Sequence, residues 1–270
     1  MKKGLSNVWW YFLIAYGFTW LFELPRTLDS QEIMESPKIL LTLSKYLPAL
    51  GPFVAAFFLI FLIEGKEGVL KLLKRGWDIR FRKIWWLAIF LLIPAMEGIA
   101  VVMSHLIAGE AFPEIPLLTQ PSAYFKSLLV LLVLAALEEY GWRGFALDRL
   151  QMRWNALVSS LILAAFWGPW HLQQWMMGGR DVPFFAFWYG ICMHSILFTW
   201  YYNNTRRSLL PVILVHALMN AQIFPTWQNS NSAMIFVAIW TLLTLAIIIF
   251  WRPRRFVRHP DELIQINKEL

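Results

Sequence analysis

The sequence has little charge and almost no cysteine for its length. Of its 270 residues only 15% are charged while 59% are hydrophobic, a balance that leaves too few polar groups to cover a water-soluble globule. The single cysteine, Cys192, lies inside an apolar run, which excludes a disulfide framework and a thiolate metal cluster. We therefore expect lipid to be the main solvent and Cys192 to be a small apolar core residue.

The sequence also lacks repeats, low-complexity tracts and polar segments long enough to fold as a second domain. It contains eight apolar stretches that could each cross the bilayer as a helix of about 20 residues. We predict an all-α, polytopic membrane protein that forms a single integral membrane domain over residues 1–270, with a cytoplasmic basic tail at 252–270. The predicted spans are Asn7–Leu24, Tyr46–Ile63, Ile84–Ile107, Phe125–Phe145, Ala156–Met177, Pro183–Tyr202, Leu209–Phe224 and Ala233–Trp251.

The basic residues predict the orientation of these spans. The net charge of +7 is divided among short tracts between apolar runs, which argues against a nucleic-acid partner. With both termini in the cytoplasm, most Lys and Arg fall on the cytoplasmic side, as the positive-inside rule requires. The side opposite the cytoplasm then holds only Arg26, Lys38, Lys45, Arg180 and, near a span end, Lys126.

Ionisable side chains inside a span are energetically costly and usually serve a function. Here they cluster in the later spans, as Glu138, Glu139 and Arg143, then His171, then His194, then His216 with Asn220. Glu138 precedes Arg149 by eleven residues, about 16 Å, and His216 follows Arg207 by nine, about 14 Å. We therefore expect Glu138, His171 and His216 to lie in one layer in the cytoplasmic half of the membrane.

Helix geometry separates the roles of these residues. Glu139 and Arg143 are four residues apart and can form an ion pair, which leaves Glu138 as a candidate general base. His216 and Asn220 share a face and could hold a water molecule or an oxyanion. Each group could instead have a purely structural role. The glutamates and Arg143 could form a buried clamp, and the histidines and Asn220 could form hydrogen bonds between helices. That interpretation is favoured for three further residues in the spans, His194, Glu97 and His105.

At these positions the sequence resembles the CAAX-protease and bacteriocin-processing (CPBP, or Abi) family of intramembrane proteases. The family carries EExxxR, FxxxH and HxxxN motifs on separate spans. Glu138, Glu139 and Arg143 match the first motif, and His216 with Asn220 match the last. In the middle motif Trp167 stands four residues before His171, where the family has phenylalanine. The resemblance covers residues 125–224, which we expect to be the catalytic core.

The resemblance implies hydrolysis of a peptide bond near the cytoplasmic face, as in relatives that remove the last three residues of prenylated proteins. Glu138 and His171 would activate water, His216 and Asn220 would stabilise the oxyanion, and Glu139 with Arg143 would hold the span. The expected partners are a peptide or protein substrate, lipidated in the relatives, and the lipids of a bacterial cell membrane. A zinc ion bound by Glu138, His171 and His216 is the alternative, but HExxH is absent, and we favour chemistry without a cofactor.

Two other classes of function fit buried acids and histidines. A proton-coupled or ion-coupled transporter would use them as a relay, but it predicts inverted repeats and a polar path to both faces. The outer halves of the fourth to seventh spans are instead almost wholly apolar. A catalytically idle immunity or binding protein would keep its function when Glu138 is replaced by glutamine.

Overall fold

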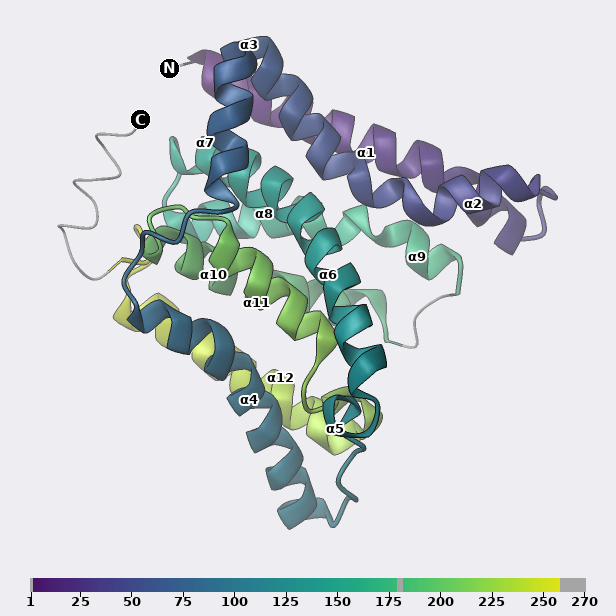
Figure 1. Ribbon diagram of the computed structural model, residues 1–270, viewed down its shortest axis with the longest axis vertical. Helices are drawn as coiled ribbons and strands as arrows, with labels where there is room; N and C mark the ends of the chain where they lie inside the picture. Colours follow the sequence, from purple (N-terminus) through teal and green to yellow (C-terminus); the bar gives the residue numbers. More distant parts are fainter. Residues whose placement is uncertain (1, 179–181, 258–270) are drawn as a thin grey trace. The chain divides into compact units, whose positions relative to one another are not determined.

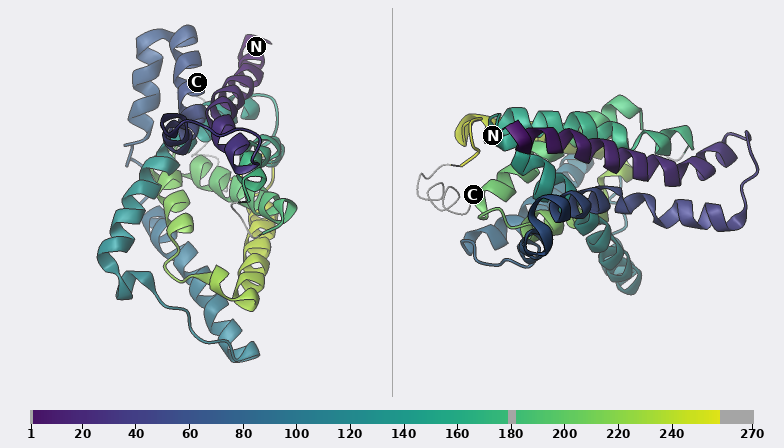
Figure 2. Two further views of the ribbon diagram at one scale, coloured as in Figure 1. Left: turned by 90° about the vertical axis from the view of Figure 1, so that its right-hand side faces the viewer. Right: turned by 90° about the horizontal axis from the view of Figure 1, so that it is seen from above.

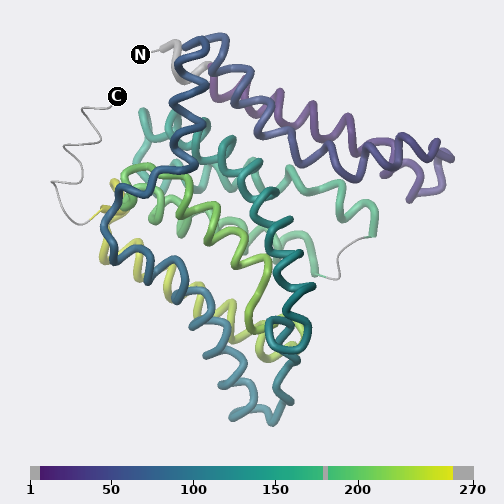
Figure 3. Tube along the Cα trace, viewed as in Figure 1, coloured from purple at the N-terminus to yellow at the C-terminus, as the bar shows by residue number. Residues whose placement is uncertain are grey.

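The computed structural model describes residues 2–178 and 182–257, and every regular element in that part of the chain is a helix (Figures 1 and 3). The predicted all-α membrane class is confirmed. Three of the predicted spans correspond to α1 (Lys2–Ser30), α8 (Ala156–Trp170) and α10 (Phe184–Asn204). That these helices cross the membrane stays a prediction, as do the count of eight spans and their orientation. Arg180 and the tail beyond residue 257 lie outside the described residues. Five helical stretches are long and apolar enough to cross a membrane, namely Lys38–Arg75, Ile84–Ala108, Pro121–Gln151, Leu210–Gln228 and Ser230–Phe250.

The chain divides into two compact units. Unit 1 comprises Met1–Gly76 and Leu137–Thr199, and unit 2 comprises Trp77–Ala136 and Trp200–Leu270. The boundaries fall inside two helices, α6 (Pro121–Gly141) and α10. Glu138 and His171 therefore belong to unit 1, and His216 belongs to unit 2.

The first half of unit 1 is a pair of long helices, α1 and α3 (Gly51–Arg75), that pack side by side (Figures 1 and 2). Two short elements connect them, α2 (Lys38–Tyr46) and η1 (Pro48–Leu50). Gly65 interrupts α3 with φ 65° and ψ −159°, a conformation that is essentially restricted to glycine. The predicted second span ended at Ile63, immediately before this break.

The second half of unit 1 begins with the last turn of α6, which continues into a π-helix, η2 (Trp142–Leu147), and α7 (Asp148–Gln151). Asn155 then starts α8, because its side chain accepts the N–H of Val158 at 2.8 Å. The predicted fifth span, Ala156–Met177, is not one helix: it divides at His171 into α8 and α9 (Leu172–Met176). Pro169 explains the break, because it lacks an N–H for the helical ladder.

Unit 2 is built around α4 (Ile84–Ala108), which packs along α12 (Ser230–Phe250) and α11 (Leu210–Ala221). Beyond these lie two short helices, α5 (Pro116–Thr119) and η3 (Thr226–Gln228).

The chain after α12 is fixed against the end of α10. The side-chain amide groups of Asn203 and Asn204 donate to the carbonyls of Arg255 and Phe256, at 2.8 and 2.6 Å, and the Phe256 ring is fully buried. The beginning of the predicted basic tail is therefore part of the folded unit.

Candidate functional site

The π-helix η2 lies directly after the two glutamates of the first motif. It begins after Gly141, where a Cβ atom would lie 2.5 Å from both the Pro52 carbonyl oxygen and the Tyr11 hydroxyl oxygen. Only glycine allows this close approach of α6 to α1 and α3. Single π-helical turns are rare and occur mostly at functional sites, because they redirect the side chains that follow.

Glu139 and Arg143 form the ion pair that their spacing predicts. Arg143 Nη1 lies 2.8 Å from Glu139 Oε1, and both side chains are completely buried. The Arg143 guanidinium also lies over two aromatic rings, 4.3 Å from the centroid of Trp167 and 4.8 Å from that of Phe198. The charge of Glu139 and the π-faces of the rings together compensate for the burial of the cation.

Glu138 is oriented differently from its neighbour. Its side chain is partly exposed, and its Oε2 atom accepts the indole N–H of Trp167 at 2.7 Å. Trp167 is 2% exposed and lies on α8, so the contact joins the end of α6 to α8. This short contact is charge-assisted when the carboxylate is ionised.

His171 lies where α8 ends. In a continuous helix its N–H would bond the Trp167 carbonyl, but it bonds the Gly168 carbonyl instead, at 3.1 Å. The Trp167 carbonyl therefore accepts from the imidazole Nδ1 atom, at 2.9 Å. Since a carbonyl cannot donate, this contact places a proton on Nδ1 and leaves the lone pair of neutral His171 on Nε2.

The aromatic residues around His171 hold its ring in place. The ring packs edge-on against Trp170 and Phe187, with centroid distances of 4.7 and 5.1 Å, and the residue is 8% exposed. Such packing fixes the direction of Nε2, as a residue that orients water requires.

His194 joins this cluster from α10. Its ring lies 6.2 Å from that of Trp167 and 5.6 Å from that of Phe198. Only the packing of α10 places His194 beside an aromatic ring of the middle motif.

Sequence reasoning missed two residues of this region. Tyr11 on α1 is fully buried, stacks on Phe145 at 5.2 Å and packs edge-on against Trp142 at 5.5 Å. Trp167 was considered only as an aromatic replacement for phenylalanine, although its N–H contacts Glu138. The indole N–H of a buried Trp usually has a partner, which is the signal that could have identified this contact.

The remaining two predicted residues lie on α11 in unit 2. His216 is buried and Asn220, one turn later, is exposed. The start of α11 is fixed by Ser208, whose hydroxyl group accepts the N–H of Leu210 at 3.3 Å and donates to the Asp78 carbonyl at 2.6 Å.

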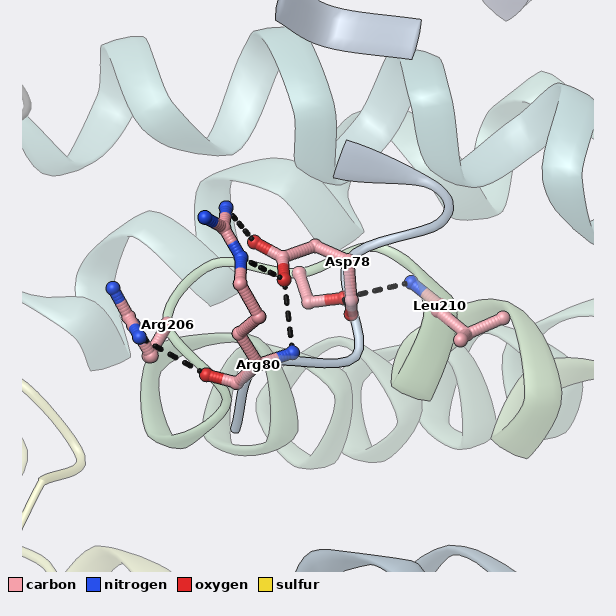
Figure 4. Close-up of polar contacts among 5 residues, drawn as sticks. Asp78, Arg80, Arg206 and Leu210 are labelled. Atoms are coloured by element: carbon pink, nitrogen blue, oxygen red, sulfur yellow. Dashed lines mark hydrogen bonds and ion pairs between the residues drawn. The ribbon is translucent and has the colours of Figure 1, made fainter. Parts of the chain in front are cut away.

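The loop that contains Asp78 is itself held by charge (Figure 4). The Asp78 carboxylate accepts the backbone N–H and two guanidinium N–H groups of Arg80, each at 2.9 Å, and these bonds hold its pKa below the usual value. The Arg80 carbonyl in turn accepts from Arg206 at 3.1 Å.

The end of α11 is held by Glu97 of α4. Glu97 Oε2 accepts the backbone N–H groups of Ile223 and Phe224, at 3.0 and 3.1 Å, and the residue is 1% exposed. Gln222, just before them, has φ 43°, so the chain turns sharply after the helix. These contacts agree with the structural role expected for Glu97, and they act on the helix that carries His216 and Asn220.

A zinc site would need three or four side chains that meet at one point. Among residues 2–178 and 182–257, no three His, Cys, Asp or Glu side chains are grouped so that they could hold a metal ion. The Nδ1 atom of His171 is already in contact with a carbonyl, which leaves Nε2 as its only atom for a ligand bond. No step of the proposed chemistry is therefore assigned to a metal.

Comparison with known proteins supports the resemblance. Residues 120–222 match a family model described as type II CAAX prenyl endopeptidase Rce1-like. Over 217 residues the chain is 25% identical to CAAX prenyl protease 2 of Methanococcus maripaludis, an alignment that covers 76% of this chain and 80% of the relative. The predicted relationship is confirmed, as is the prediction of an integral membrane protein.

Proposed function

We propose that this chain, which is related to the Rce1-like type II CAAX prenyl endopeptidases, is an intramembrane endopeptidase that activates water with Glu138 and His171. One observation carries the proposal. Trp167 contacts both residues, Glu138 through its indole N–H at 2.7 Å and His171 through its carbonyl at 2.9 Å. A carboxylate and an imidazole held by one residue are suited to orienting and deprotonating a single water molecule.

In the proposed reaction, water donates one hydrogen bond to His171 Nε2 and its other proton to the Glu138 carboxylate. The water oxygen forms a bond to the carbonyl carbon of the scissile peptide, and the π-electron pair moves onto the carbonyl oxygen. Stabilisation of this oxyanion by His216 and Asn220 stays a prediction from the resemblance. When the C–N bond breaks, Glu138 returns the proton to the leaving amine, so the enzyme is regenerated.

The proposed substrate is a protein with a CAAX-type C-terminus. The name of the archaeal relative refers to prenylated CAAX substrates, and the matched segment contains Glu138, His171, His216 and Asn220. A membrane enzyme gains from lipidation because the lipid concentrates the peptide at the bilayer.

The test is cleavage of a prenylated C-terminal peptide by the purified protein in detergent, with products identified by mass spectrometry. We expect wild type to release a C-terminal fragment, while Glu138→Gln and His171→Ala lose at least about 100-fold in kcat. The matched controls are Glu67→Gln and His105→Ala, which change exposed residues and should retain activity. If Glu138→Gln turns over like wild type, the proposed function is wrong.

Two further arms separate the alternatives. A chelator added to the same assay should leave cleavage intact, whereas loss that is restored by zinc would favour the metal version. Liposomes that contain wild type should show no proton flux dependent on Glu138; flux that Glu138→Gln abolishes would favour a transporter.

A further inference from the structure

The residue that contacts the proposed general base is the one at which this chain departs from its family's motif. Phenylalanine stands four residues before the histidine in FxxxH, and this chain has Trp167 there. A phenyl ring has no hydrogen-bond donor, whereas the indole N–H of Trp167 lies 2.7 Å from Glu138 Oε2. We infer that Trp167 is a positioning residue that fixes the carboxylate of Glu138 for catalysis. This inference rests on the proposed function.

The indole ring is rigid enough for this role. Trp167 is 2% exposed, and its ring is packed on one side by the Arg143 guanidinium at 4.3 Å. Phe198 packs against it too, with a centroid distance of 6.0 Å. Tryptophan has only two side-chain torsions, so this packing determines the direction of its N–H. Glutamate has three torsions, and the N–H selects among the positions that its carboxylate can adopt.

The same residue also sets the position of His171. The Trp167 carbonyl accepts from Nδ1, so the backbone of Trp167 orients the imidazole while its side chain orients the carboxylate. Replacing the indole by phenyl removes the hydrogen bond to Glu138 and keeps the one to His171, because the carbonyl is retained. A displacement of the reacting group by about 1 Å lowers turnover on the order of 100-fold.

A second tryptophan provides a matched control. Trp188 of α10 is partly buried, and its indole N–H donates to the Ala164 carbonyl of α8 at 3.0 Å. Trp188→Phe therefore removes an indole hydrogen bond of similar length that does not involve Glu138. If the bonds of both tryptophans serve only stability, the two replacements should have the same effect.

The first measurement is the kinetics of Trp167→Phe and Trp188→Phe in the peptide-cleavage assay. We expect Trp167→Phe to lower kcat by about 10- to 100-fold with KM within about twofold, because binding groups are unchanged. Trp188→Phe should keep the wild-type kcat. Equal kcat values in Trp167→Phe and wild type, or equal losses in both variants, would overturn the inference. If wild type is active and Glu138→Gln is inactive, the proposed function has passed its own test. Either of these results then contradicts the inference about Trp167 alone.

The second measurement does not depend on activity. In a ¹⁵N–¹H spectrum of the protein in micelles, the indole resonance that disappears in the Trp167→Phe variant belongs to Trp167. We expect this resonance to move upfield in Glu138→Gln, because a neutral amide accepts more weakly than a carboxylate. The Trp188 resonance should not move. An unchanged Trp167 resonance would show that its N–H does not bind the Glu138 carboxylate, and the inference would be wrong.

Discussion

Replacing Arg143 with methionine removes a cation from a fully buried ion pair and leaves the charge of Glu139 uncompensated. Breaking a buried pair in this way costs about 3–5 kcal/mol. The guanidinium also contacts the rings of Trp167 and Phe198, and the loss of these cation–π contacts adds on the order of 1 kcal/mol. We therefore expect Arg143→Met to lower the free energy of unfolding by at least about 3 kcal/mol.

The double replacement tests the reason for this cost. In Glu139→Gln with Arg143→Met no charge remains unpaired, so its cost should be smaller than the sum of the two single costs by at least about 2 kcal/mol. The assay is reversible unfolding of the purified protein by titration of SDS into mixed micelles.

An ion pair whose cation is exposed serves as the control. Arg80 lies 2.9 Å from Asp78, nearly the same separation as in the buried pair, but its side chain is 74% exposed. Arg80→Gln should therefore cost no more than about 1 kcal/mol. The reasoning is refuted if the double variant equals the sum of the single variants within about 0.5 kcal/mol, or if Arg80→Gln costs as much as Arg143→Met.

Three other predictions concern the elements that support the site. Glu97→Ala leaves the partly buried N–H groups of Ile223 and Phe224 without this acceptor and should cost about 2–4 kcal/mol, whereas Glu97→Gln keeps an acceptor and should cost less. Faster amide exchange at both residues checks this. Because the pKa of Asp78 is lowered in the fold, its ionised carboxylate stabilises the protein at pH values above the usual aspartate pKa near 4. This stabilisation is lost as the pH falls through the lowered pKa. The melting temperatures of wild type and Asp78→Asn should therefore converge at that pH. Gly65→Ala should cost about 1–3 kcal/mol in the same SDS titration through backbone strain alone, because a Cβ atom at Gly65 would meet no atom within 4 Å.

Much of the fold could be predicted from the sequence because lipid imposes a simple rule on the chain. A segment in hydrocarbon must hydrogen-bond its own backbone N–H and C=O groups, so long apolar stretches form helices. The structure places helices at all eight predicted spans. The Glu139–Arg143 pair was also predictable, since it depends only on the four-residue spacing within one helical segment. Both are local properties, which sequence patterns report well.

The site required tertiary structure, because its contacts join side chains far apart in the chain. Trp167 meets Glu138 only because α8 packs against the end of α6, and Tyr11 reaches Gly141 only because α1 does. The break at His171 depends on Pro169, but only the structure shows that the freed Trp167 carbonyl accepts from the imidazole.

The sequence by itself therefore determined that this is a helical membrane protein with acids and histidines inside its spans. Tertiary structure decided which of those residues contact one another. The physical reason is that apolar burial depends on composition and length, whereas a hydrogen bond of 2.7 Å depends on the packing and rotation of two separate helices.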